Sequence, residues 1–267
     1  MYIKMRALFV VIVMVSVSFI GSMKLYSQET FYIKKTDKTV ISIPTSEIET
    51  MYFSKSGTLN ETVVPVDGVT DIDGNVYNTI KIGTQTWMQS DLKVTKYNTG
   101  ASIPLVIKND KWKKLTTGGY SWYDNKEFDK SSPYGAFYNG FVVKSGNICP
   151  KGWHVPSKED WYILKASCDE GLYCGRALKE VGTLHWKKNK DATNKTGFTA
   201  LPTGMRKSSG SFDWREASGH LWSTTEKKNN KSSTFFSLSI VSHTSFIYDS
   251  FYNMNTGNCI RCIKDEY

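Results

Sequence analysis

The segment CPKGWHVPSKEDWYILKASC, residues 149–168, constrains the fold most strongly because it contains the clearest helix pattern in the chain. Its first part is not helical, since Pro156 keeps the residues before it extended. We therefore expect residues 153–155 to form an extended approach to a helix. His154, within this approach, is interpreted as a hydrogen-bonded structural residue rather than a catalytic base.

The helix itself is predicted to begin after Ser157. This serine can cap the helix, and Asp160, three residues later, can complete a capping box. The side chains that then fall on one face indicate packing on a sheet, and they are Trp161, Leu164 and Cys168. A second short helix is predicted near residues 175–181, ended by Gly182.

The chain after the second helix predicts short strands joined by loops rich in Gly, Ser and Asn. The strand patterns are TGFTALPTGMR, GHLWSTTE, TFFSLSIV and NCIRCIKD. One helical region within many irregular strands indicates an α+β fold.

An acidic turn in TDIDGNVYNTIKIGTQTWM, residues 70–88, raises the question of a calcium loop. An EF-hand-type loop has its glycine sixth and an acidic residue twelfth, whereas here Gly74 is fourth, counted from Asp71, and Ile82 is twelfth. We therefore interpret Asp73-Gly74 as the positive-φ pair of a tight hairpin turn, and a second turn at residues 83–85 as the next corner of a meander. No metal or other cofactor is predicted.

The N-terminus has the pattern of a secretory signal peptide. Lys4 and Arg6 precede an uncharged apolar run at residues 7–20, and small and polar residues follow it. The run is shorter than the roughly 20 residues that a bilayer-spanning helix needs. We expect cleavage near Gln28 and no stable transmembrane anchor afterwards, with a retained anchor as the alternative. The destination is then the periplasm, the outer surface or the extracellular medium.

The chain is basic, with a formal charge of +9 that falls to +6 when Lys4, Arg6 and Lys24 leave with the signal peptide. In an exported protein, nucleic acid is not an expected partner. The basic clusters therefore predict either solvated loop charge or contact with acidic glycans or lipid head groups. These clusters are at residues 111–114, 185–188 and 226–231.

The chain is predicted to have two folded parts. At 267 residues, 40% hydrophobic and 13% aromatic, it can bury one good-sized core or two smaller ones. Residues 29–56 predict a small β-hairpin unit with a turn at residues 36–38. Residues 57–68 are polar and lack periodicity, so they are interpreted as a linker. Residues 69–265 are dense in aromatic side chains and form the main domain.

Five cysteines in an exported chain favour disulfides and leave one thiol unpaired. Cys168 and Cys174 bracket a short acidic loop and can close it. Cys149 precedes the helix, and Cys259 and Cys262 belong to the predicted last strand. A long bridge from Cys149 to one of these two is therefore attractive. The alternative is five free or buried thiols.

Six motifs occur in order between residues 69 and 265, and they are DIDGNVYNTIKIGTQTWMQSDL, YGAFYN, CPKGWHVPSKEDW, GFTALPTG, LWSTTE and IRCIKD. Together they resemble the Fibrobacter succinogenes major paralogous domain, a family of exported and surface proteins of Bacteroidetes-like bacteria whose biochemical role is generally unassigned. That family is similar, more distantly, to the fold of C-type lectins and formylglycine-generating enzyme. The resemblance implies a C-type-lectin-like domain of short irregular strands with one main helix and a second short helix.

The resemblance also implies particular residues. The long disulfide would join Cys149 to Cys262, whereas Cys168, Cys174 and Cys259 are additions to the family pattern. The motif residues that we interpret as structural are Asp73, Gly74, Trp87, Trp153, His154, Pro156, Trp161, Phe198, Pro202, Trp222 and Arg261.

The function that the resemblance implies is non-catalytic binding or surface display, with a glycan or a cell-surface protein as partner. The calcium-dependent sugar motifs of lectins, Glu-Pro-Asn or Gln-Pro-Asp and Trp-Asn-Asp, do not occur, so we expect binding without calcium. The Gly-rich stretch between meander and helix contains Trp112, Trp122 and Tyr123, which as exposed rings can stack on sugar faces.

The enzymatic alternative is a copper-thiolate oxidase resembling formylglycine-generating enzyme, with Cys259 and Cys262 on one soft metal ion. Residues three apart on a strand point to opposite faces, so both thiols meet one ion only across a bulge or turn. A bridge from Cys149 to Cys262 would remove the site.

Other catalytic patterns do not occur in the sequence, including His-Glu-x-x-His, Gly-x-Ser-x-Gly and a phosphate-binding loop. His185, His220 and His243 have no acidic or thiol partner at ligand spacing. Asp213 and Glu216 lie in a polar loop, and we interpret them as a solvated pair.

Overall fold

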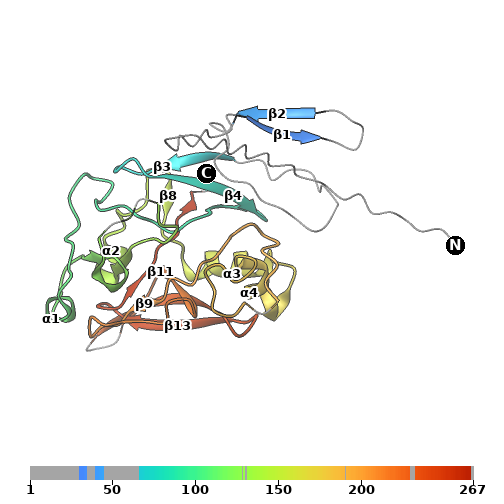
Figure 1. The fold of residues 1–267 in the computed structure, drawn as a ribbon. Helices are drawn as coiled ribbons and strands as arrows, with labels where there is room; N and C mark the ends of the chain where they lie inside the picture. The colour runs from blue at the N-terminus through green and yellow to red at the C-terminus, as the bar shows by residue number, and fades with distance from the viewer. Residues whose placement is uncertain are drawn as a thin grey trace, which may run out of the picture. The chain divides into compact units, whose positions relative to one another are not determined.

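Figure 1 shows a computed structural model of the chain, which describes residues 30–34, 40–44 and 66–265, except residues 128, 130, 190 and 229–231. The chain divides into two compact units, Met1–Glu61 and Thr62–Tyr267. Every motif of the family resemblance belongs to the second unit.

The first unit contains an antiparallel pair of strands, β1 (Thr30–Lys34) and β2 (Val40–Pro44). In the register of this pair, Phe31 lies opposite Ile43. The two strands occupy the positions predicted for the N-terminal hairpin. The predicted signal peptide, the turn at residues 36–38 and most of the predicted linker lie outside the described residues.

Five strands form the first antiparallel sheet of the second unit, in the order β3 (Val66–Thr70), β4 (Val76–Ile82), β5 (Gln85–Met88), β15 (Ile263–Lys264) and β8 (Trp153–His154). The first three strands are the predicted meander. β3 begins inside the predicted linker, because it pairs with β4 across a bulge that starts at Val66. Ile263 lies opposite both Trp87 and His154, so the C-terminal strand sits beside the approach to the main helix.

Three longer strands form a second antiparallel sheet, in the order β11 (Ser218–Lys228), β12 (Ser233–Val241) and β13 (Ile247–Asn253). The prediction of short irregular strands is wrong for this part of the chain. Six consecutive residues are buried in each of β11 and β12, so both faces of these strands are covered. Such strands lack the alternation by which a half-buried strand is recognised.

Five short strands form a third sheet, in the order β10 (Phe212–Asp213), β9 (Met205–Arg206), β14 (Gly257–Asn258), β7 (Phe137–Asn139) and β6 (Tyr120–Ser121). The sheet brings together segments that are far apart in the sequence. It places the loop after β6 and the loop after β10 on the same structural support.

The helices are short, and they are α1 (Asn109–Lys113), α2 (Gly140–Ser145), α3 (Lys158–Ala166) and α4 (Cys174–Leu178), with 3₁₀ turns η2 (Tyr123–Asn125) and η3 (Gly171–Tyr173). The fold is therefore α+β, and mainly β. α3 has the predicted capping box. α4 ends earlier than predicted, because Lys179 is extended, with ψ of 143°, and forms a bridge to Ala200. Within the described residues, no helix has the length and apolar character needed to cross a bilayer.

The core of the second unit contains Trp87, Trp161 and Trp222 of the family motifs, and Trp153 packs against it, partly buried. The rings of Trp87 and Trp161 lie 4.7 Å apart, and Phe198 packs edge-on against both. Trp222 is fully buried in a second cluster, where its indole N–H donates to the carbonyl of Tyr138 at 2.7 Å. The tryptophans therefore stabilise the domain from inside.

Two cysteine pairs lie at disulfide distance. Cys149 is joined to Cys262, the pair that the resemblance implies, with Cα atoms 6.0 Å apart. Cys168 is joined to Cys174 after α3, with Cα atoms 5.5 Å apart. Cys259 is a buried free cysteine. The prediction that Cys259 and Cys262 belong to the last strand is wrong. Both lie between β14 and β15, because the chain leaves one sheet there and crosses to another.

Candidate functional site

The acidic hairpin loop between β3 and β4 uses its carboxylate oxygens for internal hydrogen bonds. Asp71 accepts from the backbone N–H groups of Asp73 and Asn75, at 2.9 and 3.0 Å. Its other oxygen accepts from the hydroxyl of Tyr77 at 2.6 Å. Asp73 accepts from the backbone N–H and the hydroxyl of Thr95, at 2.6 and 2.8 Å. These groups hold the meander in place, and among the described residues no cluster of three or more His, Cys, Asp or Glu could hold a metal ion.

The turn in this loop differs from the predicted one. Gly74 has a φ of 82°, but Asp73 does not have a positive φ. The carbonyl of Asp71 accepts from the N–H of Gly74 at 3.1 Å, and the N–H of Asp71 donates to the carbonyl of Asn75 at 3.0 Å. The loop therefore has three residues between its paired ends, and only the glycine needs the left-handed conformation.

His154 connects three parts of the chain. Its Nδ1 lies 2.6 Å from Asp265 and its Nε2 lies 3.4 Å from Asp160, which also caps α3. The hydrogen bonds to Asp160 and Asp265 raise the pKa of His154. Its ring therefore ties the helix start to the C-terminal strand.

The other histidines have different surroundings. His185 Nδ1 lies 2.8 Å from a carboxylate oxygen of Glu180, so the prediction that it has no acidic partner is wrong. The two residues meet because the chain turns back after α4. His220 is buried, with its ring nitrogens 2.8 and 2.9 Å from the hydroxyls of Ser218 and Ser239. Burial lowers the pKa of His220 to about 4.

Trp112 is not an exposed stacking ring, and this prediction is wrong. Its side chain is 0% exposed, because its indole N–H donates to the carbonyl of Asn255 at 2.6 Å and Arg206 stacks on its ring. A tryptophan among lysines has the composition of a surface segment, although here the ring points inward and only the lysines point outward.

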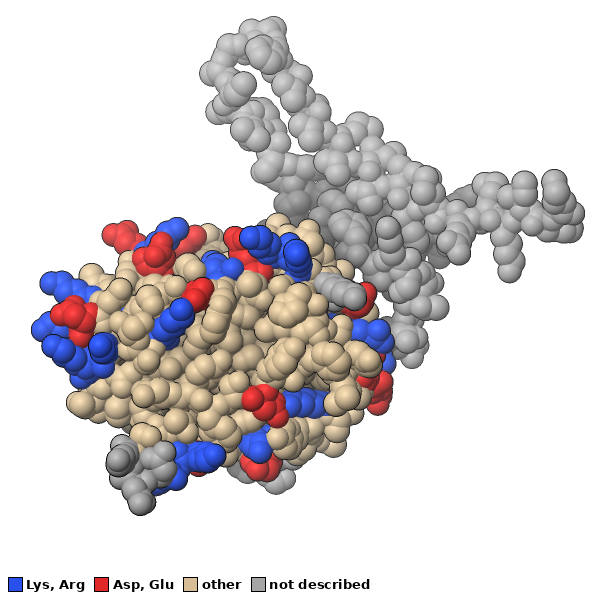
Figure 2. All heavy atoms as spheres, turned by 90° about the horizontal axis from the view of Figure 1, so that it is seen from below, with Lys and Arg blue, Asp and Glu red and all other residues tan. Residues whose placement is uncertain are grey.

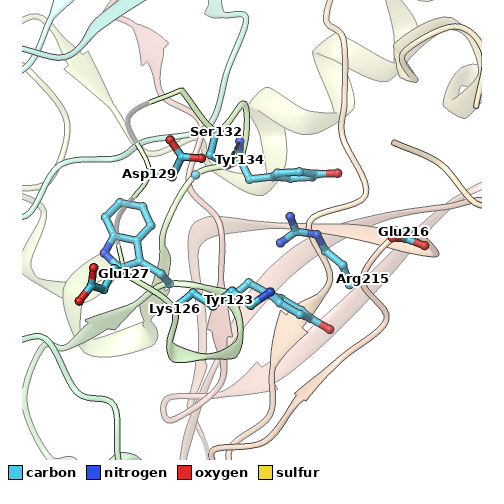
Figure 3. Close-up of a pocket in the computed structure, with 10 residues that line it drawn as sticks. Tyr123, Lys126, Glu127, Asp129, Ser132, Tyr134, Arg215 and Glu216 are labelled. Atoms are coloured by element: carbon cyan, nitrogen blue, oxygen red, sulfur yellow. Dashed lines mark hydrogen bonds between the residues drawn. The ribbon is translucent and has the colours of Figure 1, made fainter. Parts of the chain in front are cut away.

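A cavity of about 440 Å³ opens where the loop after β6 meets the loop between β10 and β11 (Figure 3). Its wall consists of described residues from two segments of the chain, one between Trp122 and Gly135 and one at residues 215–216. The volume is in the range of small-ligand sites. Trp122 and Tyr123, two of the three predicted ligand residues, belong to this wall, although Trp122 is only 8% exposed.

Arg215 is the central side chain of this pocket. Figure 3 shows its guanidinium between the rings of Tyr134 and Tyr123, on the side that faces Asp129 and Glu127. The guanidinium carbon lies 3.6 Å from the centroid of Tyr134 and 4.7 Å from that of Tyr123. Cation–π contact on two sides fixes the plane of the guanidinium.

The backbone around Arg215 is unusual and helps to present this side chain. Trp214 and Glu216 have φ values of 60° and 64°, in the left-handed region that non-glycine residues rarely adopt. The conformation is maintained because Glu216 N–H donates to the carbonyl of Pro202 at 3.0 Å, and Lys187 N–H donates to the carbonyl of Glu216 at 2.9 Å. Strained backbone of this kind is concentrated at functional sites.

Packing against the core also fixes the positions of the two tyrosines. Gly135 follows Tyr134, and a Cβ at this position would lie 2.6 Å from Cβ of Asp91, so only glycine lets the chain run this close to the core. Tyr123 packs on the ring of Phe212 at 5.3 Å. Burial raises the pKa of both tyrosines, and Arg215 partly opposes the increase. Both phenols are therefore neutral at ordinary pH and carry hydroxyl groups.

The charges in the pocket are of both signs. Arg215 and Lys126 supply positive charge, and Glu127, Asp129 and Glu216 supply negative charge. Such a wall offers hydrogen-bond donors and acceptors beside apolar ring surface, which suits a neutral, hydroxyl-rich ligand better than a strongly anionic one. Among the described residues that line the wall, none is a histidine or cysteine, and the ring of His185 lies next to it, 5.4 Å from that of Tyr134.

Sequence reasoning found part of this pocket. Tyr134 is the first residue of the YGAFYN motif, but the motif was interpreted only as a family signature. Arg215 was missed, since it lies in the polar loop in which Asp213 and Glu216 were interpreted as a solvated pair. Asp213 instead bonds Lys207 at 2.6 Å and the N–H of Trp214 at 2.8 Å.

The thiol pair of the oxidase alternative is not present in this structure. Cys262 is bonded to Cys149, so it is not a free thiol. Cys259 is buried among a different set of core residues from Cys262, and burial raises the pKa of its thiol well above the ordinary range.

Comparison with known proteins identifies the domain. No curated protein and no solved structure is significantly similar to this chain. The family model for the Fibrobacter succinogenes major domain matches residues 80–264, which include the end of β4, β5, both disulfides and the residues that line the pocket. The chain belongs to the Fibrobacter succinogenes major domain family.

Proposed function

We propose that this protein is an exported binding or surface-display module that takes a hydroxyl-rich ligand, a glycan, in the pocket at Arg215 without calcium. The observation that supports it most is the guanidinium held between Tyr123 and Tyr134 at a cavity of about 440 Å³. A fixed guanidinium can donate two parallel hydrogen bonds to neighbouring sugar oxygens. The partly exposed ring edges supply apolar contact for the sugar face.

Binding without calcium is supported by the use of the acidic groups. Asp71 and Asp73 are already bonded to backbone and hydroxyl donors. In the pocket, Glu127 and Asp129 are exposed and form no cluster of metal-ligand type with a third described group. They can accept hydrogen bonds from sugar hydroxyls instead.

Export and a C-type-lectin-like architecture are part of the same proposal. The apolar run at residues 7–20 after Lys4 and Arg6 supports export, and two cysteine pairs at disulfide distance suit an oxidising compartment. The bridge from Cys149, before the main helix, to Cys262, near the last strand, is the pattern that the family resemblance implies for a lectin-like fold.

The experiment is a glycan array probed with the full chain, followed by titration of the best glycan. Arg215→Gln removes the charged donor pair and should weaken that glycan about tenfold or more. Tyr134→Leu removes one of the two rings that hold the guanidinium of Arg215 and should have a similar effect. Tyr134→Phe keeps the ring and should keep most of the affinity. Addition of EDTA should leave binding unchanged.

The matched control is Arg176→Gln, which removes an arginine that is paired with Glu170 outside this pocket. It should leave the glycan affinity unchanged. The proposal is wrong if no glycan binds, if EDTA abolishes binding, or if the Arg176 and Arg215 variants lose affinity equally.

A further inference from the structure

The chain has a basic surface segment, residues 105–114, that is separate from the pocket wall. Its exposed lysines are Lys108, Lys111, Lys113 and Lys114, and Asp110 is its one acidic residue. Among the described residues, no carboxylate lies within ion-pair distance of these four lysines. In Figure 2, blue spheres gather at the left end of the molecule, the end at which Figure 1 places α1.

The same segment exposes apolar side chains next to the lysines. Leu105 is 51% exposed and Ile107 is 52% exposed. Leu105 forms an isolated parallel bridge to Tyr120, and Ile107 follows it two positions later, just before α1. Other large apolar side chains of the described residues are exposed too, so the informative observation is the combination of Leu105 and Ile107 with four lysines that have no described carboxylate at ion-pair distance. Cationic side chains around an exposed apolar pair are typical of surfaces that lie at a lipid interface.

The basic segment is fixed to the core. Trp112 is the buried residue of α1, and Asn255 fixes the C-terminal end of this helix, since its side-chain amide donates to the carbonyls of Trp112 at 3.2 Å and Leu115 at 2.7 Å. A Cβ on Gly210 would lie 2.6 Å from Cα of Asn109, so the loop between β9 and β10 packs directly against α1. The backbone that carries the lysines is therefore fixed before binding, so little backbone ordering is needed when the lysines contact a partner.

We propose that the basic segment docks the domain onto an anionic lipid surface. The four lysines contact the lipid head groups, and Leu105 and Ile107 enter the interfacial layer. A lipid surface fits better than an acidic polysaccharide, because a hydrated polymer offers no apolar phase for the two aliphatic side chains. Docking in this way would hold the domain at an envelope surface while the glycan pocket stays separate.

The test is sedimentation of the full chain with phosphatidylcholine vesicles, with and without phosphatidylglycerol. Lys111→Gln, Lys113→Gln and Lys114→Gln are combined in one variant. Each lysine near an anionic surface contributes about fivefold in partitioning, so the combined variant should lose roughly 100-fold on the anionic vesicles. The matched control changes the same number of exposed lysines elsewhere, Lys187→Gln, Lys188→Gln and Lys264→Gln, and should lose much less.

Lysine acylation read by mass spectrometry locates the contact. Anionic vesicles should protect Lys108, Lys111, Lys113 and Lys114 from the reagent and leave Lys187 and Lys188 reactive. This readout does not depend on the apolar run at residues 7–20, which is the same in every variant and can bind lipid by itself. If these four lysines stay as reactive with anionic vesicles as without them, the proposal is wrong, even if the chain sediments with the vesicles.

A second variant separates lipid from polyanion. Leu105→Ser with Ile107→Ser keeps all four lysines and should lower binding to anionic vesicles about tenfold, without changing binding to dextran sulfate. If this variant binds the vesicles as tightly as the parent chain, the surface recognises charge alone and the lipid proposal is wrong. Unchanged tryptophan fluorescence checks that each variant is folded.

Discussion

Three arginines of the domain stack on aromatic rings, and their surroundings separate structural from functional roles. Arg206 and Arg261 are fully buried and direct their N–H groups to carbonyls or, for Arg261, to the carboxylate of Asp91 at 2.8 Å. Burial lowers the pKa of Arg206 to about 10. Arg215 is only partly buried and faces a cavity. It is therefore the stacked arginine that can meet a ligand.

His220 makes the stability of the domain depend on pH. The ring is buried between two serine hydroxyls, and its pKa is lowered from 6.5 to about 4. Below pH 6.5 the unfolded chain binds a proton at this histidine and the folded chain does not, so acid favours the unfolded state. The free energy of unfolding should fall by at most about 3 kcal/mol between pH 6.5 and pH 4 from this residue.

Urea denaturation between about pH 5 and pH 6.5 measures this effect, because protonation of carboxylates contributes less in that window. The raised pKa of His154 acts in another window, since its stabilisation is complete below 6.5 and is lost only at higher pH. His220→Gln should flatten the dependence of the unfolding free energy on pH. His243→Gln, at an exposed histidine, is the control, and an unflattened slope in the His220 variant would contradict the assignment.

Helix α3 shows how a local signal determines an element. The hydroxyl of Ser157 accepts from the N–H of Asp160 at 3.1 Å, and the carboxylate of Asp160 accepts from the N–H of Ser157 at 2.8 Å. Each bond satisfies a backbone group that the helix start leaves unpaired. The same carboxylate contacts His154, so the cap also joins the helix to the first sheet.

Loss of the cap should be measurable. Ser157→Ala should lower the free energy of unfolding by about 1 kcal/mol, and Ser157→Thr, which keeps the hydroxyl, should restore most of it. Ser209→Ala, in an exposed loop, is the control for loss of a serine hydroxyl. Equal unfolding free energies for the Ala and Thr variants would show that the hydroxyl does not stabilise α3.

Elements with local signals were predictable, and elements that depend on distant residues were not. The meander and α3 follow from turn residues and from the cap, which act within a few positions. α2 also has local signals, since Asn139 accepts from the N–H of Val142 and Gly146 ends it with φ of 71°, but both were overlooked. Trp122 and Tyr123 were predicted as ligand residues, but the pocket itself was not, because Arg215 contacts Tyr134 from a segment far away in the sequence.

At the scale of the whole second unit, the chain is closed by two bridges of very different span. The bridge from Cys149 to Cys262 spans 113 residues and joins the approach to α3 with the start of β15. The bridge from Cys168 to Cys174 spans 6 residues. In the chain-entropy account, a cross-link stabilises by restricting the unfolded chain, and the effect increases with the length of the loop that it closes.

The two bridges should therefore differ in what their removal costs. Cys149→Ala with Cys262→Ala should lower the free energy of unfolding by about 5 kcal/mol, and Cys168→Ala with Cys174→Ala by about 2 kcal/mol. All four cysteines are almost completely buried, so the loss of packing is similar in the two double variants and largely cancels in their comparison. Denaturant unfolding of both variants beside the parent chain gives the difference. Equal losses, or a larger loss for the short bridge, would mean that the long bridge does not act through the unfolded chain.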